Sequence, residues 1–353
     1  MKRKREVLSM SKAGANTWEN SVALFNEVSQ QTIDLYKELA NSTVKILDYS
    51  ENATYLVEKP DVGEKYILRV CRPNYHTKEE IASEVHWLQS IDENTSIIVS
   101  RPILGLNNEY IQTVTLDNRP FEYYCVLFTF LDGEEPDVDD EDKLIKVFGE
   151  IGRTTAKIHN HVVNNWKEFE QIKRPIWNYE TILGENPKWA RWQDGLGITP
   201  ERLELFERVS KVIKSRLEKF GKDCNRFGLI HADLRHANLL VKDGEVKVID
   251  FDDSGFGWYL YDLAASLTFI EHRPYVPELI EEWLKDYRKV RALSEEEEKE
   301  IPTFIMMRRL QLIAWVGSRD NETAQELGSE YTEQTDELAK AYLKNFESSV
   351  ITG

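Results

Sequence analysis

The chain has 353 residues, more than a single hydrophobic core usually holds, so its length favours two domains or one domain with two lobes. Hydrophobic residues make up 41% and charged residues 30%, a globular composition that excludes a collagen-like or disordered chain. The 62 acidic residues outnumber the 45 basic ones and give a net charge of −17, which disfavours nucleic acid and anionic membranes as partners and suits a neutral or cationic small substrate.

The cysteines indicate a reducing compartment. Cys71, Cys125 and Cys224 are far apart and form no Cys-x-x-Cys pair, so neither a disulfide framework nor a zinc knuckle is expected. No stretch approaches the ~18 to 20 apolar residues that cross a bilayer. We therefore expect a cytoplasmic protein that does not span or bind a membrane.

The first third of the chain predicts helices and an antiparallel sheet of about five strands. One or two short helices are expected over 18–39, where apolar residues recur at helical spacing. A further helix is expected over 77–89, because Thr77 can act as N-cap and Glu80 completes a capping box. The strand candidates alternate and are rich in β-branched and aromatic residues; they lie at 43–59, 64–71, 110–115 and 122–131.

The rest of the chain is mainly helical after an acidic connector at 132–142. Helical spacing of apolar residues covers 143–161, 200–220, 276–290, 295–317 and 323–346. The exception is a hairpin, in which the apolar runs 239–241 and 246–249 flank the turn residues Lys242-Asp243-Gly244. Gly255-Phe256-Gly257 is expected to be a turn. We predict an α+β fold with two domains, 1–132 (N-terminal helix, five-stranded sheet, one inserted helix) and 133–353 (helical).

Three side chains of the hairpin region suggest phosphoryl transfer. Asp233 and Asn238 are five residues apart in His231-Ala-Asp233-x4-Asn238, and Asp250 follows at the end of the second hairpin strand. Phosphoryl transfer from ATP needs a carboxylate that orients the attacking hydroxyl and oxygen ligands that hold Mg²⁺ against the phosphates. Asp233 fits the first role, and Asn238 and Asp250 fit the second. We expect His231 to shape the loop through hydrogen bonds.

This motif, with Ile249-Asp250-Phe251-Asp252-Asp253 and Tyr261-Asp262-Leu263-Ala264, resembles the aminoglycoside phosphotransferase and choline kinase superfamily of protein-kinase-like enzymes. The resemblance covers the chain from about residue 40 onward. It implies a bilobal fold with a small β-rich N-lobe, a larger helical C-lobe, and ATP in the cleft between them. It also implies that Asp233 is the catalytic base, that Asn238 and Asp250 hold Mg²⁺ with Asp252 as an extra carboxylate, and that Asp262 braces the catalytic loop.

The resemblance further implies a phosphate-binding residue at Arg69, where the family usually carries a lysine. An arginine keeps the positive charge but replaces a point charge by a planar fork. Its ion-pair partner is expected on the helix 77–89, with Glu84 favoured and Glu80 as the alternative. A glycine-rich phosphate loop is missing, so Ser50 and Asn52 are the candidates that close over the nucleotide.

The strand end 127–133 resembles the hinge of these enzymes. The backbone of Thr129 and Leu131 is expected to hydrogen-bond adenine, with Phe128 as a wall of the pocket. An apolar central strand that leaves the sheet explains the same composition.

The acceptor is less well defined by the sequence. Arg308 and Arg309 lie on an apolar helix, so at least one is expected to face solvent while the other could reach an anionic acceptor. Four tryptophans could form an aromatic cage for a cation or a sugar, although core packing is the favoured reading; they are Trp166, Trp177, Trp189 and Trp192.

Together these features predict an ATP- and Mg²⁺-dependent phosphotransferase that acts on a hydroxyl of a small molecule. Aminoglycosides, amino alcohols, hydroxy amino acids and sugar-like compounds are the acceptor classes considered. A serine/threonine protein kinase of the same fold is the alternative within enzymes. A nucleotide-binding pseudokinase that serves as an interaction module is a further alternative: Arg69 and the missing glycine loop leave it open, whereas the intact Asp233, Asn238 and Asp250 argue against it.

Overall fold

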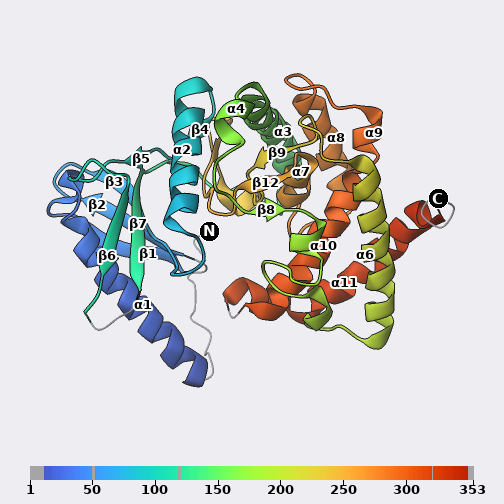
Figure 1. Ribbon diagram of the computed structural model, residues 1–353, viewed down its shortest axis with the longest axis horizontal. Helices are drawn as coiled ribbons and strands as arrows, with labels where there is room; N and C mark the ends of the chain where they lie inside the picture. The colour runs from blue at the N-terminus through green and yellow to red at the C-terminus, as the bar shows by residue number, and fades with distance from the viewer. Residues whose placement is uncertain (1–11, 50–51, 118–120, 320, 349–353) are drawn as a thin grey trace. The chain divides into compact units, whose positions relative to one another are not determined.

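The computed structural model describes residues 12–49, 52–117, 121–319 and 321–348 (Figure 1). These residues form two compact units. The first consists of the described parts of Met1–Val85 and Ser100–Phe130, and the second of His86–Val99 with the described parts of Leu131–Gly353. The segment His86–Val99, which the sequence placed in the first domain, thus groups with the second unit. The first unit is rich in strands and the second is mainly helical, so the α+β prediction is confirmed.

The first unit contains a fully antiparallel six-stranded sheet. The strand order is β1-β2-β3-β7-β5, and β6 also pairs with β7. The strand that the sequence did not indicate is β5, which has only two residues. The bounds are β1 (Thr43–Tyr49), β2 (Ala53–Lys59), β3 (Glu64–Val70), β5 (Pro102–Ile103), β6 (Ile111–Thr115) and β7 (Glu122–Thr129).

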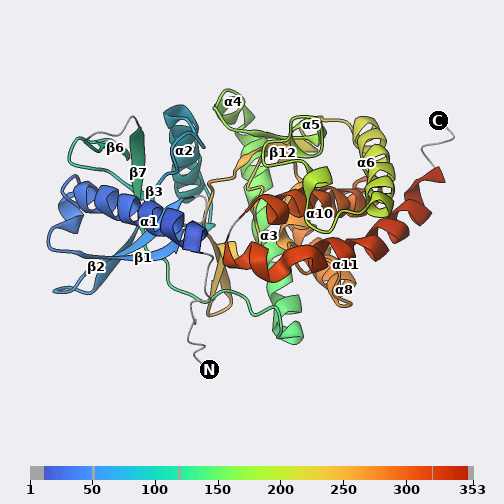
Figure 2. The ribbon, with the colours of Figure 1, turned by 90° about the horizontal axis from the view of Figure 1, so that it is seen from below.

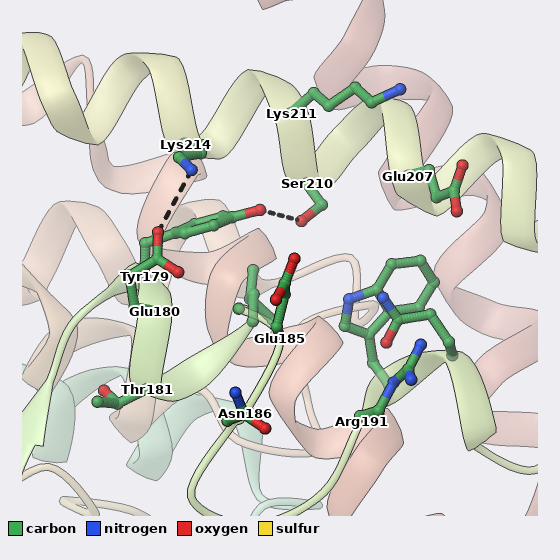
Figure 3. A pocket seen from close by; sticks show the side chains of 14 residues that line it. Tyr179, Glu180, Thr181, Glu185, Asn186, Arg191, Glu207, Ser210, Lys211 and Lys214 are labelled. Carbon is green, nitrogen blue, oxygen red and sulfur yellow. Dashed lines mark hydrogen bonds and ion pairs between the residues drawn. The ribbon is translucent and has the colours of Figure 1, made fainter.

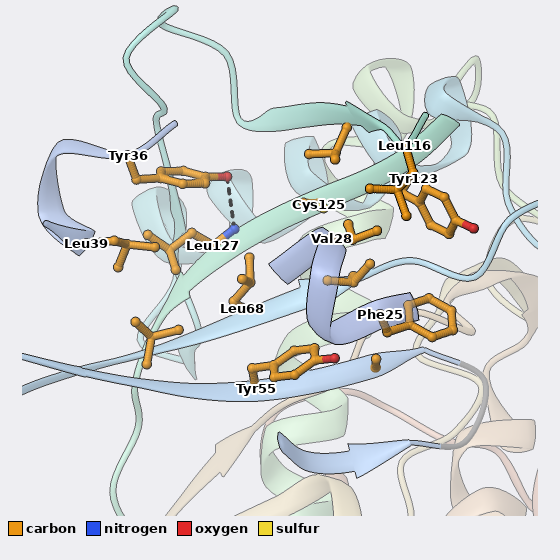
Figure 4. Close-up of a cluster of buried hydrophobic side chains, with 14 residues drawn as sticks. Phe25, Val28, Tyr36, Leu39, Tyr55, Leu68, Leu116, Tyr123, Cys125 and Leu127 are labelled. Carbon is orange, nitrogen blue, oxygen red and sulfur yellow. Dashed lines mark hydrogen bonds between the residues drawn. The ribbon is translucent and has the colours of Figure 1, made fainter. Parts of the chain in front are cut away.

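One face of this sheet is covered by α1 (Lys12–Ile33) and the 3₁₀ helix η1 (Lys37–Leu39), and the core of the unit lies between them (Figure 4). Alternate residues of the strands point into that core, as Leu68 and Val70 of β3 do. Tyr36 closes one end, because its hydroxyl oxygen accepts the N–H of Leu127 at 3.3 Å. Arg69, between Leu68 and Val70, consequently points to the opposite face of the sheet.

The helix α2 (Lys78–Asn94) begins with the predicted capping box. The Thr77 hydroxyl accepts the N–H of Glu80 at 3.2 Å, and the Glu80 carboxylate accepts the N–H of Thr77 at 2.8 Å. Both groups would otherwise lack partners at a helix start. The helix continues past the predicted end at Gln89 to Asn94.

The second unit is built mainly from helices (Figure 2). One expected helix over 295–317 is in fact two, because Pro302 cannot continue a helix but suits the first turn of a new one. The bounds are α3 (Glu141–Asn164), α4 (Trp166–Phe169), α5 (Tyr179–Ile182), α6 (Pro200–Phe220), α7 (Leu260–Ser266), α8 (Val276–Tyr287), α9 (Glu295–Glu298), α10 (Ile301–Ser318) and α11 (Glu322–Phe346), with the 3₁₀ helices η2 (Trp192–Asp194) and η3 (His236–Asn238).

Two small sheets carry the loops of the candidate site. The predicted hairpin is present as β10 (Leu239–Lys242) and β11 (Glu245–Val248), joined by Asp243 and Gly244 at φ 53° and 83° and extended by β4 (Ile98–Val99). The second sheet has the order β8 (Ile176–Trp177), β12 (Gly255–Trp258), β9 (Phe227–Ile230). The expectation of a turn at Gly255-Phe256-Gly257 is wrong, because these residues pair with β9 and β8.

The expectation that Arg308 or Arg309 faces solvent is also wrong. Their exposed fractions are 2% and 0%, because α10 is an inner helix that is buried on nearly all sides. Arg309 donates to the buried carboxylate of Glu271 at 2.7 Å and to the carbonyl of Tyr331 at 2.7 Å. The Tyr331 hydroxyl donates to Glu271 at 3.1 Å, which completes a buried polar network.

Replacing Glu271 by glutamine should therefore destabilise the protein strongly. The change keeps the shape but leaves the buried guanidinium of Arg309 without its counter-charge, a loss of about 3 to 5 kcal/mol in the free energy of unfolding. Glu337→Gln removes the partner of an exposed ion pair with Lys340 and should cost far less, because solvent screens that pair. Urea denaturation of both variants measures the difference; equal losses would contradict the structural role of the Arg309 network.

None of the helices in the described ranges is both long and apolar enough to cross a bilayer.

Candidate active site

The candidate catalytic loop, residues 231–238, joins β9 to β10. Its first turn is held by Asp262 on α7, whose carboxylate accepts the N–H of His231 at 3.1 Å and of Ala232 at 2.7 Å. Ala232 has φ 67°, a conformation that a residue with a Cβ seldom adopts. These two hydrogen bonds offset that strain, so Asp262 fixes the backbone immediately before Asp233.

Asp262 is itself positioned by His159 of α3, which the sequence did not single out. The His159 Nε2 lies 3.1 Å from the Asp262 carboxylate, and its Nδ1 lies 2.9 Å from the Tyr287 hydroxyl. Burial lowers the pKa of His159 despite the opposing effect of Asp262. The ring is therefore neutral, donates from Nε2 and accepts from Tyr287 at Nδ1.

The carboxylate of Asp233 accepts hydrogen bonds from three side chains. Arg308 donates to Oδ1 at 2.6 Å, and Asn238 and Arg235 donate to Oδ2 at 2.8 Å and 3.3 Å. Burial raises the pKa of Asp233, but the charges of Arg235 and Arg308 outweigh burial and hold the pKa below its ordinary value. Asp233 is therefore an ionised carboxylate in a fixed orientation.

Asn238 and Asp250 lie next to each other at the base of the hairpin, because the N–H of Ile249 donates to the Asn238 carbonyl at 3.0 Å. The amide nitrogen of Asn238 donates to Asp233, so its side-chain oxygen is the atom that can bind a cation. Asp250 has φ 61°, and Asp252 is buried two residues later. Carboxylate and amide oxygens are the donors that Mg²⁺ prefers, together with phosphate and water.

The described residues contain no cluster of three or more His, Cys, Asp or Glu side chains arranged around a common metal position. The donors offered by the loop are thus an amide oxygen and carboxylates of one short segment. A cation held there must take further ligands from phosphate or water, which is the usual state of Mg²⁺ at nucleotide sites.

His231 makes hydrogen bonds to two segments of the candidate site. Its Nδ1 accepts the N–H of Asp233 at 3.3 Å, and its Nε2 donates to the carbonyl of Ile249 at 3.1 Å. The ring centroid lies 4.5 Å from that of Phe251. His231 therefore ties the catalytic loop to the segment that carries Asp250.

In the first unit, Arg69 and Glu84 form a bidentate ion pair. Both guanidinium Nη atoms lie 2.8 Å from the two carboxylate oxygens, and both side chains are buried. Glu80, the alternative partner, is occupied by the capping box of α2. The pair uses two of the five N–H donors of the guanidinium.

The remaining residues predicted to bind the nucleotide differ in the contacts that the structure shows for them. Ser50 lies outside the described residues. Asn52 is buried, and its side-chain oxygen accepts the N–H of Arg72 at 3.0 Å. The N–H of Thr129 donates to the carbonyl of Arg101 at 2.9 Å and is therefore not available to a base, whereas Leu131 follows the end of β7.

The main site contact that the sequence missed is the pairing of Arg308 with Asp233, which are far apart in the chain. Arg308 also donates to the hydroxyls of Tyr261 and Thr268, each at 3.2 Å. Its guanidinium carbon lies 5.4 Å from the Trp189 ring centroid. An arginine in an otherwise apolar helix was the available signal, because such a charge must find a buried partner.

The four tryptophans do not form one cage. Trp177 and Trp192 are buried core side chains, and Trp166 packs edge-on against Phe256. Trp189 stands edge-on to Trp177 with a centroid distance of 5.6 Å. Trp189 is therefore the indole that lies beside Arg308.

A separate pocket of about 1010 Å³ lies between α5, α6 and residues 183–193 (Figure 3). The Tyr179 hydroxyl lies 2.9 Å from that of Ser210 in its wall. Trp192, one of the four candidate cage tryptophans, lines it, but no residue of the catalytic loop 231–238 does, so the pocket is distinct from that loop. Its charged residues are three acids and three bases, which gives no preference for ligand charge: Glu180, Glu185, Glu207, Arg191, Lys211 and Lys214.

His236 in the loop should make stability depend on pH. Burial and the charge of Arg235 lower the pKa of His236 to about 4. Between its ordinary pKa of 6.5 and about 4, the unfolded chain binds a proton that the folded protein does not, so stability falls as pH falls. The contribution lost by pH 4 is on the order of 3 kcal/mol.

Urea denaturation at pH 7 and pH 4.5 measures this effect. His236→Asn should lose less stability between the two pH values than the wild type does. An identical loss in both proteins would show that His236 is not the responsible group.

Comparison with known proteins also points to a phosphotransferase. The model of a family described as "Phosphotransferase enzyme family" matches residues 43–297. Amicoumacin kinase of Bacillus subtilis (strain 168) is 24% identical over 276 residues, which cover 76% of this chain and 77% of that protein.

Two solved structures extend the comparison. A microcompartment-associated aminopropanol kinase is 36% identical with a TM-score of 0.81, over 90% of this chain and 98% of that one. An amicoumacin kinase solved with AMP-PNP and Ca²⁺ has 19% identity and a TM-score of 0.70, over 88% of this chain and 93% of that one, and this likeness concerns the fold alone.

Proposed function

Because the chain belongs to the phosphotransferase enzyme family, we propose that its acceptor is a small amino alcohol and that Asp233 is the catalytic base. Its activity is ATP-dependent phosphoryl transfer to an alcohol group. The family membership confirms the superfamily and the protein-kinase-like fold inferred from the sequence. The acceptor class is supported by the 36% identity to an aminopropanol kinase over nearly the whole chain. The net charge of −17 is compatible with a cationic acceptor.

The observation that carries the proposed mechanism is the triple hydrogen bonding of Asp233. A carboxylate offers about four lone-pair positions, and Arg308, Asn238 and Arg235 occupy three. The fourth can accept the hydroxyl proton of an acceptor. The three donors thereby fix the direction in which the acceptor oxygen is presented.

In the proposed reaction the acceptor oxygen forms a bond to the γ-phosphorus of ATP. The bond between that phosphorus and the bridging oxygen breaks, and its electron pair leaves with ADP. The hydroxyl proton passes to Asp233 and then to water. Because the pKa of Asp233 lies below its ordinary value, the carboxylate mainly orients the hydroxyl and takes the proton late, as suits a loose transition state.

Asn238 and Asp250 would hold Mg²⁺, with Asp252 as a further carboxylate. Bound Mg²⁺ would neutralise charge on the phosphate oxygens as ADP leaves. Arg69, oriented by Glu84, would bind phosphate oxygens. Leu131 would contribute its backbone N–H, and Thr129 its carbonyl, to adenine.

The test is Mg²⁺-dependent ADP release over a panel of acceptors. The panel contains amino alcohols, aminoglycosides, hydroxy amino acids, sugars and a generic protein, with 2-propanol as the control that lacks the amine. We expect the largest stimulation by 1-amino-2-propanol and no stimulation by 2-propanol. Stimulation by protein alone would favour a protein kinase. Mg·ATP binding with no ADP release for any acceptor would contradict the enzyme assignment.

A further inference from the structure

Arg174 binds the backbone of the segment that carries the proposed metal ligands. Its Nε donates to the carbonyl of Ser254 at 2.7 Å, and its Nη2 donates to the carbonyls of Phe251, at 3.3 Å, and of Asp252. Arg174 has an exposed fraction of 7%. Burying a guanidinium costs several kcal/mol unless its N–H groups are satisfied, and here the polypeptide directly after Asp250 supplies acceptors.

The carbonyls on either side are also held by side chains. The Trp177 Nε1 donates to the carbonyl of Asp253 at 2.7 Å, and His231 donates to that of Ile249. The carbonyl oxygens of residues 249 and 251–254 are therefore all bound by side chains from outside the segment. Such a loop has little freedom to change its backbone conformation.

The segment needs this restraint for two reasons. Asp250 has φ 61°, a left-handed conformation that persists in a non-glycine residue only where its surroundings enforce it. Asp250, Asp252 and Asp253 also place three like charges within four residues of the chain, and like charges repel one another. A buried guanidinium among their carbonyls opposes both effects.

Arg174 is well placed to act as a fixed anchor. It directly precedes Pro175, whose carbonyl accepts the N–H of Phe256 at 2.8 Å, and the next residues form β8. Strand β8 pairs in parallel with β12, which follows the metal segment (Figure 1). Arg174 and the segment it binds are therefore joined by one small sheet, so the guanidinium is supported by regular structure.

We propose that Arg174 is a positioning residue for the cation that accompanies the nucleotide. It preorganises the carbonyl groups after Asp250 so that Asp250 and Asp252 are in place before Mg²⁺ arrives. The inference rests on the proposed function, because it takes Asp250 and Asp252 as metal ligands. Partners outside the ligand shell commonly contribute 10- to 100-fold to metal affinity.

Binding of AMP-PNP by isothermal titration calorimetry tests this role without relying on turnover. Each protein is titrated once with Mg²⁺ and once in EDTA, and the readout is the ratio of the two dissociation constants. Arg174→Met is expected to reduce the Mg²⁺-dependent gain in affinity by about 10-fold or more. Its affinity for AMP-PNP in EDTA should stay within about twofold of the wild type, because the metal-free nucleotide does not use these carboxylates.

Two further variants distinguish the positioning role of Arg174 from a general loss of rigidity in the second unit. Arg216→Met removes a largely buried arginine that pairs with Glu300 at 2.6 Å in another part of the second unit, and it should keep the wild-type ratio. Arg174→Lys keeps the charge but cannot bind three carbonyls as a fork does, so it should recover only part of the ratio.

The outcomes distinguish this inference from the proposed function. A wild-type affinity that does not depend on Mg²⁺ would overturn the proposed metal role and this inference with it. A wild-type ratio retained in Arg174→Met, or fully restored in Arg174→Lys, would overturn the positioning role alone. An equal fall in Arg216→Met would do so as well.

Discussion

Asp233→Asn is expected to lower kcat by about 10³-fold or more, since general base catalysis and hydroxyl orientation are both lost. The asparagine amide cannot accept the hydroxyl proton, and its NH₂ group would face the donors of either Arg308 or Asn238. Binding of AMP-PNP should change little, because Asp233 is assigned to the acceptor side of the reaction. Steady-state ADP release and calorimetry measure the two quantities.

A parallel loss of nucleotide binding would indicate a folding defect, which thermal unfolding of the variant detects. Normal turnover in a folded Asp233→Asn protein would remove Asp233 from the mechanism. It would leave the family assignment intact.

Arg308→Met should lower kcat by roughly 10²-fold and move the acidic limb of the pH–rate profile to higher pH. In the wild type, burial raises the pKa of Asp233, and Arg235 and Arg308 together hold it below the ordinary value of 3.8. Removing Arg308 leaves the effect of burial less opposed, so the carboxylate is protonated at a higher pH. Activity should then fall at a pH where the wild type is still fully active.

Arg308→Lys is the matched variant, because it keeps the charge while it loses the fork that also reaches Tyr261 and Thr268. Its acidic limb should stay close to that of the wild type even where kcat falls. A profile for Arg308→Met that is lower but not shifted would show that Arg308 does not set the ionisation of Asp233.

The parts of the fold that local chemistry determines could be predicted from the sequence. Thr77 and Glu80 form the expected capping box, and the Asp243-Gly244 turn adopts the positive φ angles that a tight hairpin requires. The helix 200–220 was predicted to the residue from the helical spacing of its apolar residues, and in the structure Thr199 caps it and Pro200 occupies its first turn. In each case the signal lies within a few residues of the element.

The parts that depend on distant pairing could not be predicted. Strand β8 has two residues, and β12 contains two glycines that read as a turn in isolation. Gly255 pairs with Ile230 of β9, and glycine is required there because a Cβ would lie 2.5 Å from the carbonyl oxygen of Pro175, which is 80 positions away in the chain. The close packing of two segments decides this conformation, and neither segment shows it alone.

The residues of the candidate site also fall into a group that the sequence predicts and a group that it does not. The motif spacing predicted Asp233, Asn238 and Asp250, which the fold brings to one loop and one hairpin base. The contacts of Arg308 with Asp233 and of Arg174 with Ser254 could not be predicted, because the partners are 75 and 80 positions apart in the chain. The tertiary fold determines which groups these two guanidinium groups bind, and the variants of Arg308 and Arg174 test what each contact does.

The most direct test of the central assignment is the identity of the phosphorylated product. Wild-type protein is incubated with Mg·ATP and 1-amino-2-propanol, and the product is examined by ³¹P NMR and mass spectrometry, with Asp233→Asn as the control. We predict a phosphate monoester on the hydroxyl oxygen, formed in step with ADP and absent in the variant. Inorganic phosphate alone, phosphate on the amine, or product formation by the variant would contradict the account.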